Sequence, residues 1–135
     1  MIHSRDINII SHIDNYCDQI LTAMSRYGNS FAILKADDVY RYGMGMKLQQ
    51  ITELSQHLTA DFTREHGNMP WHSIKCLRIV FVHRYGKLDI GAMWSIMSVD
   101  IPELKQFCTK IIALTKRSDD PESYNGPGDC GPRMR

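Results

Sequence analysis

The sequence lacks several patterns that would place it in a chemical class at once. No two of its four cysteines, Cys17, Cys76, Cys108 and Cys130, form a Cys-x-x-Cys pair, which argues against a zinc site and against a compact disulfide framework. We therefore expect reduced thiols. No run of about eighteen apolar residues is present, so no membrane-spanning helix is expected. A Gly-rich phosphate loop and an internal repeat are also missing, which argues against a nucleotide hydrolase and a solenoid.

The chain also has almost no net charge. Its 16 Lys and Arg residues against 15 Asp and Glu residues give +1, so no global field indicates nucleic-acid or membrane binding. Between Arg64 and Lys87, however, lie five Lys or Arg residues and three histidines, with Glu65 as the single acid. This basic window indicates an anionic partner, although a solvated helix face explains it about equally well.

Length and composition predict one structured domain. A chain of 135 residues can bury roughly two-thirds of its unfolded surface without metal or disulfide support. We expect a helical domain over residues 1–117 and a disordered tail over residues 118–135, because the tail is rich in Gly, Pro and Asp. The N-terminal stretch has no charged segment followed by an apolar core, so we expect no signal peptide and a cytoplasmic protein.

The apolar pattern predicts an all-α fold. Apolar residues recur at three- and four-residue steps, and no strand alternation of useful length appears. Expected helices cover about residues 4–27 and 37–64, then a third from Pro70 through Phe81, a short one over 90–97, and a last one opened by Asp100 and Pro102 that runs to Leu114.

Four residues near helix starts have two interpretations each. Asp37 and Asp38 suit the positive end of a helix dipole, and we favour this capping role over metal ligands or catalytic acids. Trp71 and Trp94 could stack on bases, but aromatic residues at such positions are more often core anchors.

The stretch RIVFVHRYG contains the most informative residues, because it sets Arg78, His83 and Tyr85 in one apolar segment. A permanently charged guanidinium can hold a phosphate, and an imidazole that titrates near neutrality can move protons around it. The pair suggests phosphodiester chemistry, although a buried arginine and histidine are, taken alone, more often structural residues than catalysts. On a helix the Arg78 and His83 side chains diverge by roughly 140°, so two packed copies would form a shared site more easily than one copy.

The wider sequence resembles a known family. The run MPWHSIKCLRIVFVHRYGKLDIGAMWSIMSVDIPELKQF resembles the signature region of the HepT-like ribonuclease toxins, a branch of the HEPN superfamily. The segments SRDINIISHID and MKLQQITELSQHL resemble the family's first and second helices, so the likeness covers about residues 4–114. It implies an all-α, HEPN-like antiparallel helical bundle with additional short C-terminal helices.

The resemblance also implies a function. The family motif of Arg, four residues, His, one residue and Tyr falls on Arg78, His83 and Tyr85. It implies a toxin-type, metal-independent endoribonuclease without a cofactor, whose composite active site lies at a homodimer interface and contains Arg78 and His83 as catalytic residues. It further implies a partner, a minimal nucleotidyltransferase antitoxin that attaches AMP to Tyr85. Ile79 departs from the family, which usually has a polar residue there.

Two functions therefore remain open at this stage. One is the ribonuclease; the other is a non-catalytic helical dimer that binds or recruits substrate for a nucleotidyltransferase. Possible RNA-backbone contacts are Lys75, Arg84 and Lys87, together with Arg64. We expect His66 and His72 to be solvent-exposed.

Overall fold

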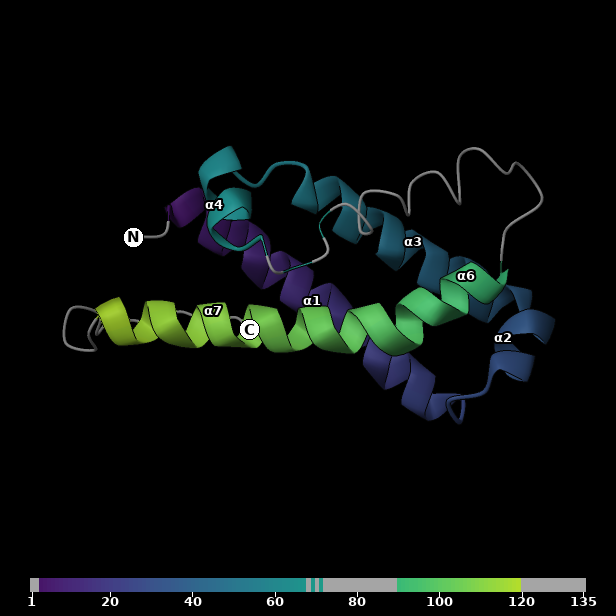
Figure 1. The fold of residues 1–135 in the computed structure, drawn as a ribbon. Helices are drawn as coiled ribbons and strands as arrows, with labels where there is room; N and C mark the ends of the chain where they lie inside the picture. Colours follow the sequence, from purple (N-terminus) through teal and green to yellow (C-terminus); the bar gives the residue numbers. More distant parts are fainter. Residues whose placement is uncertain (1–2, 68, 70, 72–89, 120–135) are drawn as a thin grey trace.

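The computed structural model describes residues 3–67, 69, 71 and 90–119. All regular secondary structure within these ranges is helical, which confirms the predicted all-α class (Figure 1). The elements are α1 (Ser4–Arg26), α2 (Phe31–Ala36), α3 (Asp38–Ser55), α4 (Ala60–Glu65), α6 (Ile90–Ser95), the π-helix η1 (Ile96–Asp100) and α7 (Ile101–Asp119). Over the described ranges, none of these helices has the length and hydropathy needed to cross a membrane.

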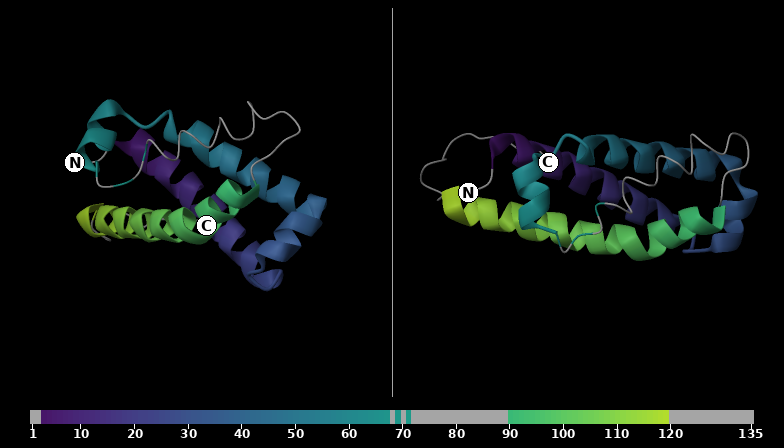
Figure 2. Two further views of the ribbon diagram at one scale, coloured as in Figure 1. Left: turned by 45° about the vertical axis from the view of Figure 1, so that its right-hand side comes forward. Right: turned by 45° about the horizontal axis from the view of Figure 1, so that its top comes forward.

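Helix α1 occupies the centre of the bundle and packs against both α3 and α7 (Figures 1 and 2). Its buried apolar side chains recur at mostly three- and four-residue steps, as the sequence predicted: Ile9, Ile10, Ile13, Cys17, Ile20 and Met24. Each fully buried aliphatic side chain contributes about 1.5–3 kcal/mol relative to an exposed one. The stripe therefore supplies much of the free energy that holds the three long helices together.

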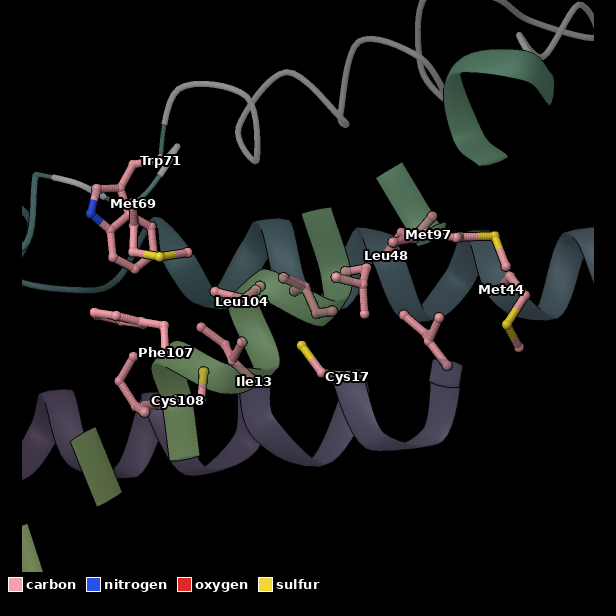
Figure 3. Packing of buried hydrophobic residues seen from close by; sticks show 14 of the residues in the cluster. Ile13, Cys17, Met44, Leu48, Met69, Trp71, Met97, Leu104, Phe107 and Cys108 are labelled. Atoms are coloured by element: carbon pink, nitrogen blue, oxygen red, sulfur yellow. The ribbon is translucent and has the colours of Figure 1, made fainter. Parts of the chain in front are cut away.

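Two cysteines lie in the seam between α1 and α7. Cys17 and Cys108 are free thiols and are completely buried (Figure 3). Burial raises the pKa of Cys17 to about 12 and raises the pKa of Cys108 as well, because a thiolate is poorly solvated there. Both therefore behave as small apolar groups, in agreement with the predicted reduced thiols; Cys76 and Cys130 lie outside the described residues.

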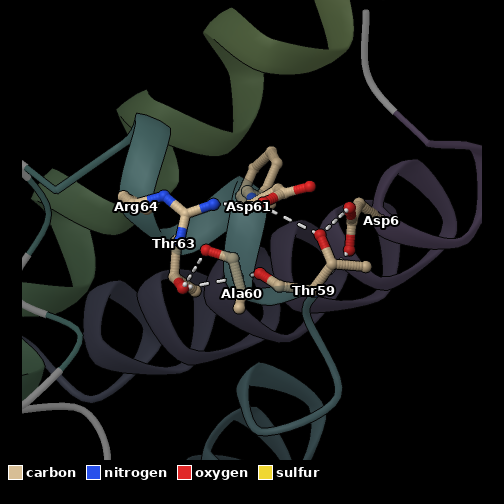
Figure 4. A network of polar contacts seen from close by, with 7 residues as sticks. Asp6, Thr59, Ala60, Asp61, Thr63 and Arg64 are labelled. Carbon is tan, nitrogen blue, oxygen red and sulfur yellow. Dashed lines mark hydrogen bonds and ion pairs between the residues drawn. The ribbon is translucent and has the colours of Figure 1, made fainter.

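The prediction of a single helix over residues 37–64 is wrong, because α3 ends at Ser55 and α4 begins at Ala60. The Thr59 amide donates to Asp6 Oδ1 at 2.9 Å and the Thr59 hydroxyl donates to Asp6 Oδ2 at 2.8 Å (Figure 4). The same hydroxyl oxygen accepts from the Phe62 amide at 3.2 Å and caps α4. A buried carboxylate on α1 thus captures the amide that a continuous helix would have used.

A short helix, α2, was not predicted. Gly28 and Asn29 end α1 with φ angles of +77° and +51°, in the left-handed region. Ser30 then caps α2, since its hydroxyl accepts from the Ile33 amide at 3.2 Å. Leu34 is completely buried, so one apolar side chain attaches this short helix to the core.

The capping role of Asp37 is confirmed. Its Oδ1 accepts from the Tyr40 amide at 3.1 Å, and Asp38 lies exposed in the first turn of α3. Nowhere in the described ranges do three or more potential ligands gather in a way that could hold a metal ion.

The last helix does not start afresh at Asp100 and Pro102 as predicted. Instead, α6, η1 and α7 follow one another without a break, and the Ile101 amide donates to the Ile96 carbonyl. Pro102 has no N–H and would clash in a regular α-helix, and the wide π turn directly before it accommodates this.

The C-terminal part of α7 also differs from expectation. Leu114, expected in the buried stripe, is 48% exposed. Helix α7 extends to Asp119, beyond the expected end of this helix at Leu114. Residues 120–135 lie outside the described residues, so the disordered tail stays a prediction.

Replacing Asp6 should destabilise the whole domain. In Asp6→Ala, the Thr59 amide and hydroxyl lose a charged acceptor. Each of the two lost hydrogen bonds should lower the free energy of unfolding by about 1.5–3 kcal/mol. Urea denaturation followed by circular dichroism would measure the loss. Asp61→Ala is the matched control, because this exposed carboxylate only pairs with exposed Arg64 and should cost less than about 1 kcal/mol. Equal losses in both variants would contradict the role given to Asp6.

Candidate functional site

Most of the residues that the sequence analysis proposed for the functional site fall within residues 72–89, which are outside the described residues. This holds for the expected catalytic and modified residues and for the expected backbone contacts: Arg78, His83, Tyr85, Lys75, Arg84 and Lys87. His72 and Ile79 fall there as well. The structure does describe the residues on either side of this segment, at Trp71 and at helix α6. We call these two places the N-terminal joint and the C-terminal joint.

The N-terminal joint is fixed by hydrogen bonds to one turn. The Met69 amide donates to the His66 carbonyl at 3.2 Å, and the Trp71 amide donates to the Met69 carbonyl at 2.8 Å. The indole Nε1 of Trp71 also donates to the His66 carbonyl, at 2.9 Å. The Met69 and Trp71 side chains are both buried, so the chain enters the segment from a firmly held position.

Aromatic packing reinforces this joint (Figure 3). The Trp71 ring meets the Phe107 ring edge-on, with centroids 5.7 Å apart, and lies 6.3 Å from the Phe62 ring. The His66 imidazole lies 4.5 Å from Phe62 and 5.4 Å from Phe107. The expectation that His66 would be solvent-exposed is therefore wrong: it is half-buried, because two rings from α4 and α7 cover it.

The C-terminal joint is helix α6, which packs against α2. Met93 is completely buried, and the Trp94 ring lies 6.0 Å from the Phe31 ring. Together with Trp71, Trp94 therefore contacts the bundle, as expected of an anchor rather than a free base-stacking platform. The described residues that flank the segment thus lie beside α4 and α7 on its N-terminal side and beside α2 on its C-terminal side.

Arg64, an expected RNA contact, lies in an environment that does not favour phosphate. It pairs with Asp61 on the same helix, and both side chains are highly exposed. The adjoining hollow of about 340 Å³ also contains Asp6 and Glu65. These carboxylates offset the positive charge of Arg64.

A second hollow was not anticipated from the sequence. It is a groove of about 410 Å³ between the C-terminal half of α1 and the N-terminal half of α3. The Tyr27 and Tyr40 rings stack at its end with centroids 4.0 Å apart. Burial, and then the neighbouring Tyr27, raise the pKa of Tyr40, whose hydroxyl has no hydrogen-bond partner among the described residues. Arg26 and Lys47 lie along the groove.

The sequence did contain a signal for this surface. Val39, Tyr42 and Met46 recur at steps of three and four residues, out of phase with the buried stripe of the same helix. Such a second apolar stripe indicates a helix face that the core does not use.

Comparison with known proteins supplies a family match. A family model described as "Ribonuclease HepT-like" matches residues 13–111, a range that includes the segment with Arg78, His83 and Tyr85. No solved structure shows a significant match.

Similar proteins have related names. "Putative RNase MJ1380" of Methanocaldococcus jannaschii is 32% identical over 66 residues, 49% of this chain and 61% of that protein. "Probable ribonuclease HepT" of Thermococcus cleftensis is 34% identical over 58 residues, 43% of this chain and 53% of that protein. "Putative RNase TTE0752" of Caldanaerobacter subterraneus subsp. tengcongensis is 25% identical over 107 residues, 79% of this chain and 94% of that protein. The chain thus spans less than two thirds of the first two relatives.

Two substitutions at Trp71 should separate the contribution of its hydrogen bond to the free energy of unfolding from the contribution of its packing. Trp71→Phe keeps an aromatic ring but loses the bond to the His66 carbonyl, at a cost of about 1 kcal/mol in unfolding free energy. Trp71→Ala also leaves a cavity against Phe107 and should cost about 3–5 kcal/mol. Urea denaturation followed by far-UV circular dichroism measures both. The exposed Tyr42 serves as the aromatic control, and the anchor role of Trp71 is refuted if Tyr42→Ala costs as much as Trp71→Ala.

Proposed function

Because the chain belongs to the HepT-like ribonuclease family, we propose that it is a toxin-type endoribonuclease that cleaves RNA without a metal ion. The observation that carries this proposal is the extent of the family match, which covers the whole motif and its two joints to the bundle. The names of the similar proteins, all of which refer to ribonucleases, support it.

In the proposed reaction, His83 and Arg78 divide the chemistry. The imidazole of His83 takes the proton from a ribose 2′-hydroxyl, whose oxygen attacks the neighbouring phosphorus as the bond to the leaving 5′-oxygen breaks. Because the reference pKa of histidine is near 6.5, an imidazole can also act as an acid and give a proton to the leaving 5′-oxygen. The guanidinium of Arg78 binds the phosphate oxygens, and its charge-assisted hydrogen bonds strengthen as negative charge builds up in the transition state.

We further propose that the active site forms between two copies of the chain. On the helix predicted for this segment, the two side chains would point roughly 140° apart, which is too divergent for a compact site. Pairing two such helices would place an arginine from one copy near a histidine from the other.

Control by a partner is the next part of the proposal. A minimal nucleotidyltransferase antitoxin would attach AMP to Tyr85, two residues from His83. The added phosphates would lie near Arg78 and would repel an RNA backbone, so the modification would stop cleavage.

A second function is favoured by one residue. Ile79 cannot donate or accept a side-chain hydrogen bond, whereas the family usually has a polar group there. If that group is essential for cleavage, the chain is instead a non-catalytic dimer that recruits substrate for the nucleotidyltransferase.

Replacing His83 tests the ribonuclease directly. The purified wild-type chain should cut single-stranded RNA in the presence of EDTA, and His83→Ala should lower the cleavage rate by about 10²-fold or more. His57→Ala, which changes an exposed histidine on the turn before α4, should cleave like the wild type. Expression of the wild type alone should arrest growth of the host, and His83→Ala should relieve the arrest. Absence of both cleavage and arrest in the wild type would leave the non-catalytic function.

Intact mass spectrometry tests the modification of Tyr85. After co-expression with a minimal nucleotidyltransferase, the wild-type chain should gain the mass of one or more AMP units, while Tyr85→Phe should gain none because it has no hydroxyl to modify. Tyr42→Phe removes an exposed hydroxyl elsewhere and should be modified like the wild type. Modification of Tyr85→Phe would disprove the assignment of this residue.

A further inference from the structure

The groove between α1 and α3 carries positive charge without a partner. Arg26 is exposed at its edge, and Lys47 donates to the neutral Gln19 side chain, with Nζ to Oε1 at 2.7 Å. Among the described residues no ion pair involves either cation. The one acid in the groove, Asp18, lies 3.9 Å from Lys105, which offsets its charge. The groove therefore favours an anionic ligand.

An exposed apolar stripe borders the same groove. Val39, Tyr42 and Met46 are 75%, 64% and 62% exposed, and they are three of the four most exposed large apolar side chains in the described part of the molecule. They share one face of α3, since steps of three and four residues return to the same side of a helix. Arg41 lies over one face of the Tyr42 ring, 5.6 Å from its centroid, and orients it.

We infer that this groove and stripe, none of whose residues belongs to the motif, are a docking site for single-stranded RNA. Such a strand carries both phosphates and flat bases, and this surface combines two cations that make no ion pair among the described residues with an exposed aromatic ring and apolar side chains. An apolar protein helix would fit the stripe but would leave Arg26 and Lys47 without counter-charges, so RNA accounts for more of the surface. The choice of RNA rests on the proposed ribonuclease function.

Gly43 offers a way to block the groove without disturbing the core. A Cβ atom built at this position meets no other atom within 4 Å, and Gly43 lines the groove. A side chain at this position therefore projects into the groove rather than into the core. Gly43→Ala should even favour the helix, because glycine is a poor helix former.

Binding can be measured apart from cleavage. The probe is a fluorescent single-stranded oligonucleotide of mixed sequence with 2′-O-methyl riboses, which cannot attack the neighbouring phosphate, titrated with the full chain at low salt. Arg26→Glu and Lys47→Glu should each raise the dissociation constant at least about fivefold and make it less sensitive to salt. Lys110→Glu is the matched control: it reverses an exposed cation on α7, outside the groove, and should change binding less than twofold.

The groove itself is tested at Gly43 and Tyr42. Gly43→Trp should weaken binding at least about fivefold, while Gly43→Ala should bind nearly like the wild type and unfold at a higher temperature. Tyr42→Ala should weaken binding at least about fivefold through loss of base stacking. Circular dichroism melting of each variant confirms that it is folded.

Several outcomes would overturn this inference. It fails if the wild type does not bind the probe, or if Arg26→Glu and Lys47→Glu bind it like Lys110→Glu. It also fails if AMP alone binds with the same dependence on Arg26 and Lys47, which would assign the groove to a free nucleotide. If Tyr42→Ala changes only the oligomeric mass and not RNA binding, the stripe is a protein interface instead.

The same variants distinguish this inference from the proposed function. His83→Ala should lose cleavage but keep binding of the probe, whereas Arg26→Glu should weaken binding of the probe. If the wild type cleaves RNA and the groove variants bind the probe like the wild type, RNA binding by the groove is refuted and the ribonuclease function is not. A wild type that does not cleave while the groove variants bind weakly would refute only the ribonuclease.

Discussion

The carboxylate of Asp6 controls how the first half of the chain connects to the segment that carries the motif. Because its two oxygens accept the amide and the hydroxyl of Thr59, the chain leaves α3 early and starts α4. Helix α4 brings Phe62 to the core and leads to His66, whose carbonyl accepts a hydrogen bond from the Trp71 indole. A buried charge costs several kcal/mol to desolvate, so it is retained only where its hydrogen bonds are made in full.

The rest of the bundle gives this connection a rigid base. Helix α1 presents one apolar face to α3 and α7, and burial in this bundle raises the pKa of the thiols of Cys17 and Cys108. At the other end of the motif segment, Met93 and Trp94 attach α6 to the bundle and to α2. These contacts hold the described residues on both sides of the segment that carries the motif.

The proposed active site and the proposed groove site would contact different parts of an RNA strand. The proposed reaction needs one phosphate and one ribose hydroxyl, which every RNA linkage offers, so the motif by itself would select little among targets. The proposed groove site would contact several nucleotides through charge and stacking, which would raise affinity for unpaired strands without reading base edges. Together they would favour flexible, single-stranded RNA over duplex RNA, whose bases are already stacked and whose grooves present a different shape.

The sequence by itself determined the class of fold, the limits of α1, the cap at Asp37, and the family to which the chain belongs. Each follows from local periodicity, a single side chain or a motif of fixed spacing, so no knowledge of distant contacts is needed. The sequence also pointed to Arg78, His83 and Tyr85, whose roles stay predictions. Only the tertiary structure decided the break before α4, the half-buried state of His66, and the groove beside Lys47. These depend on residues far apart along the chain, because Asp6 must meet Thr59, Phe107 must reach His66, and α1 must lie beside α3 before any of them can form.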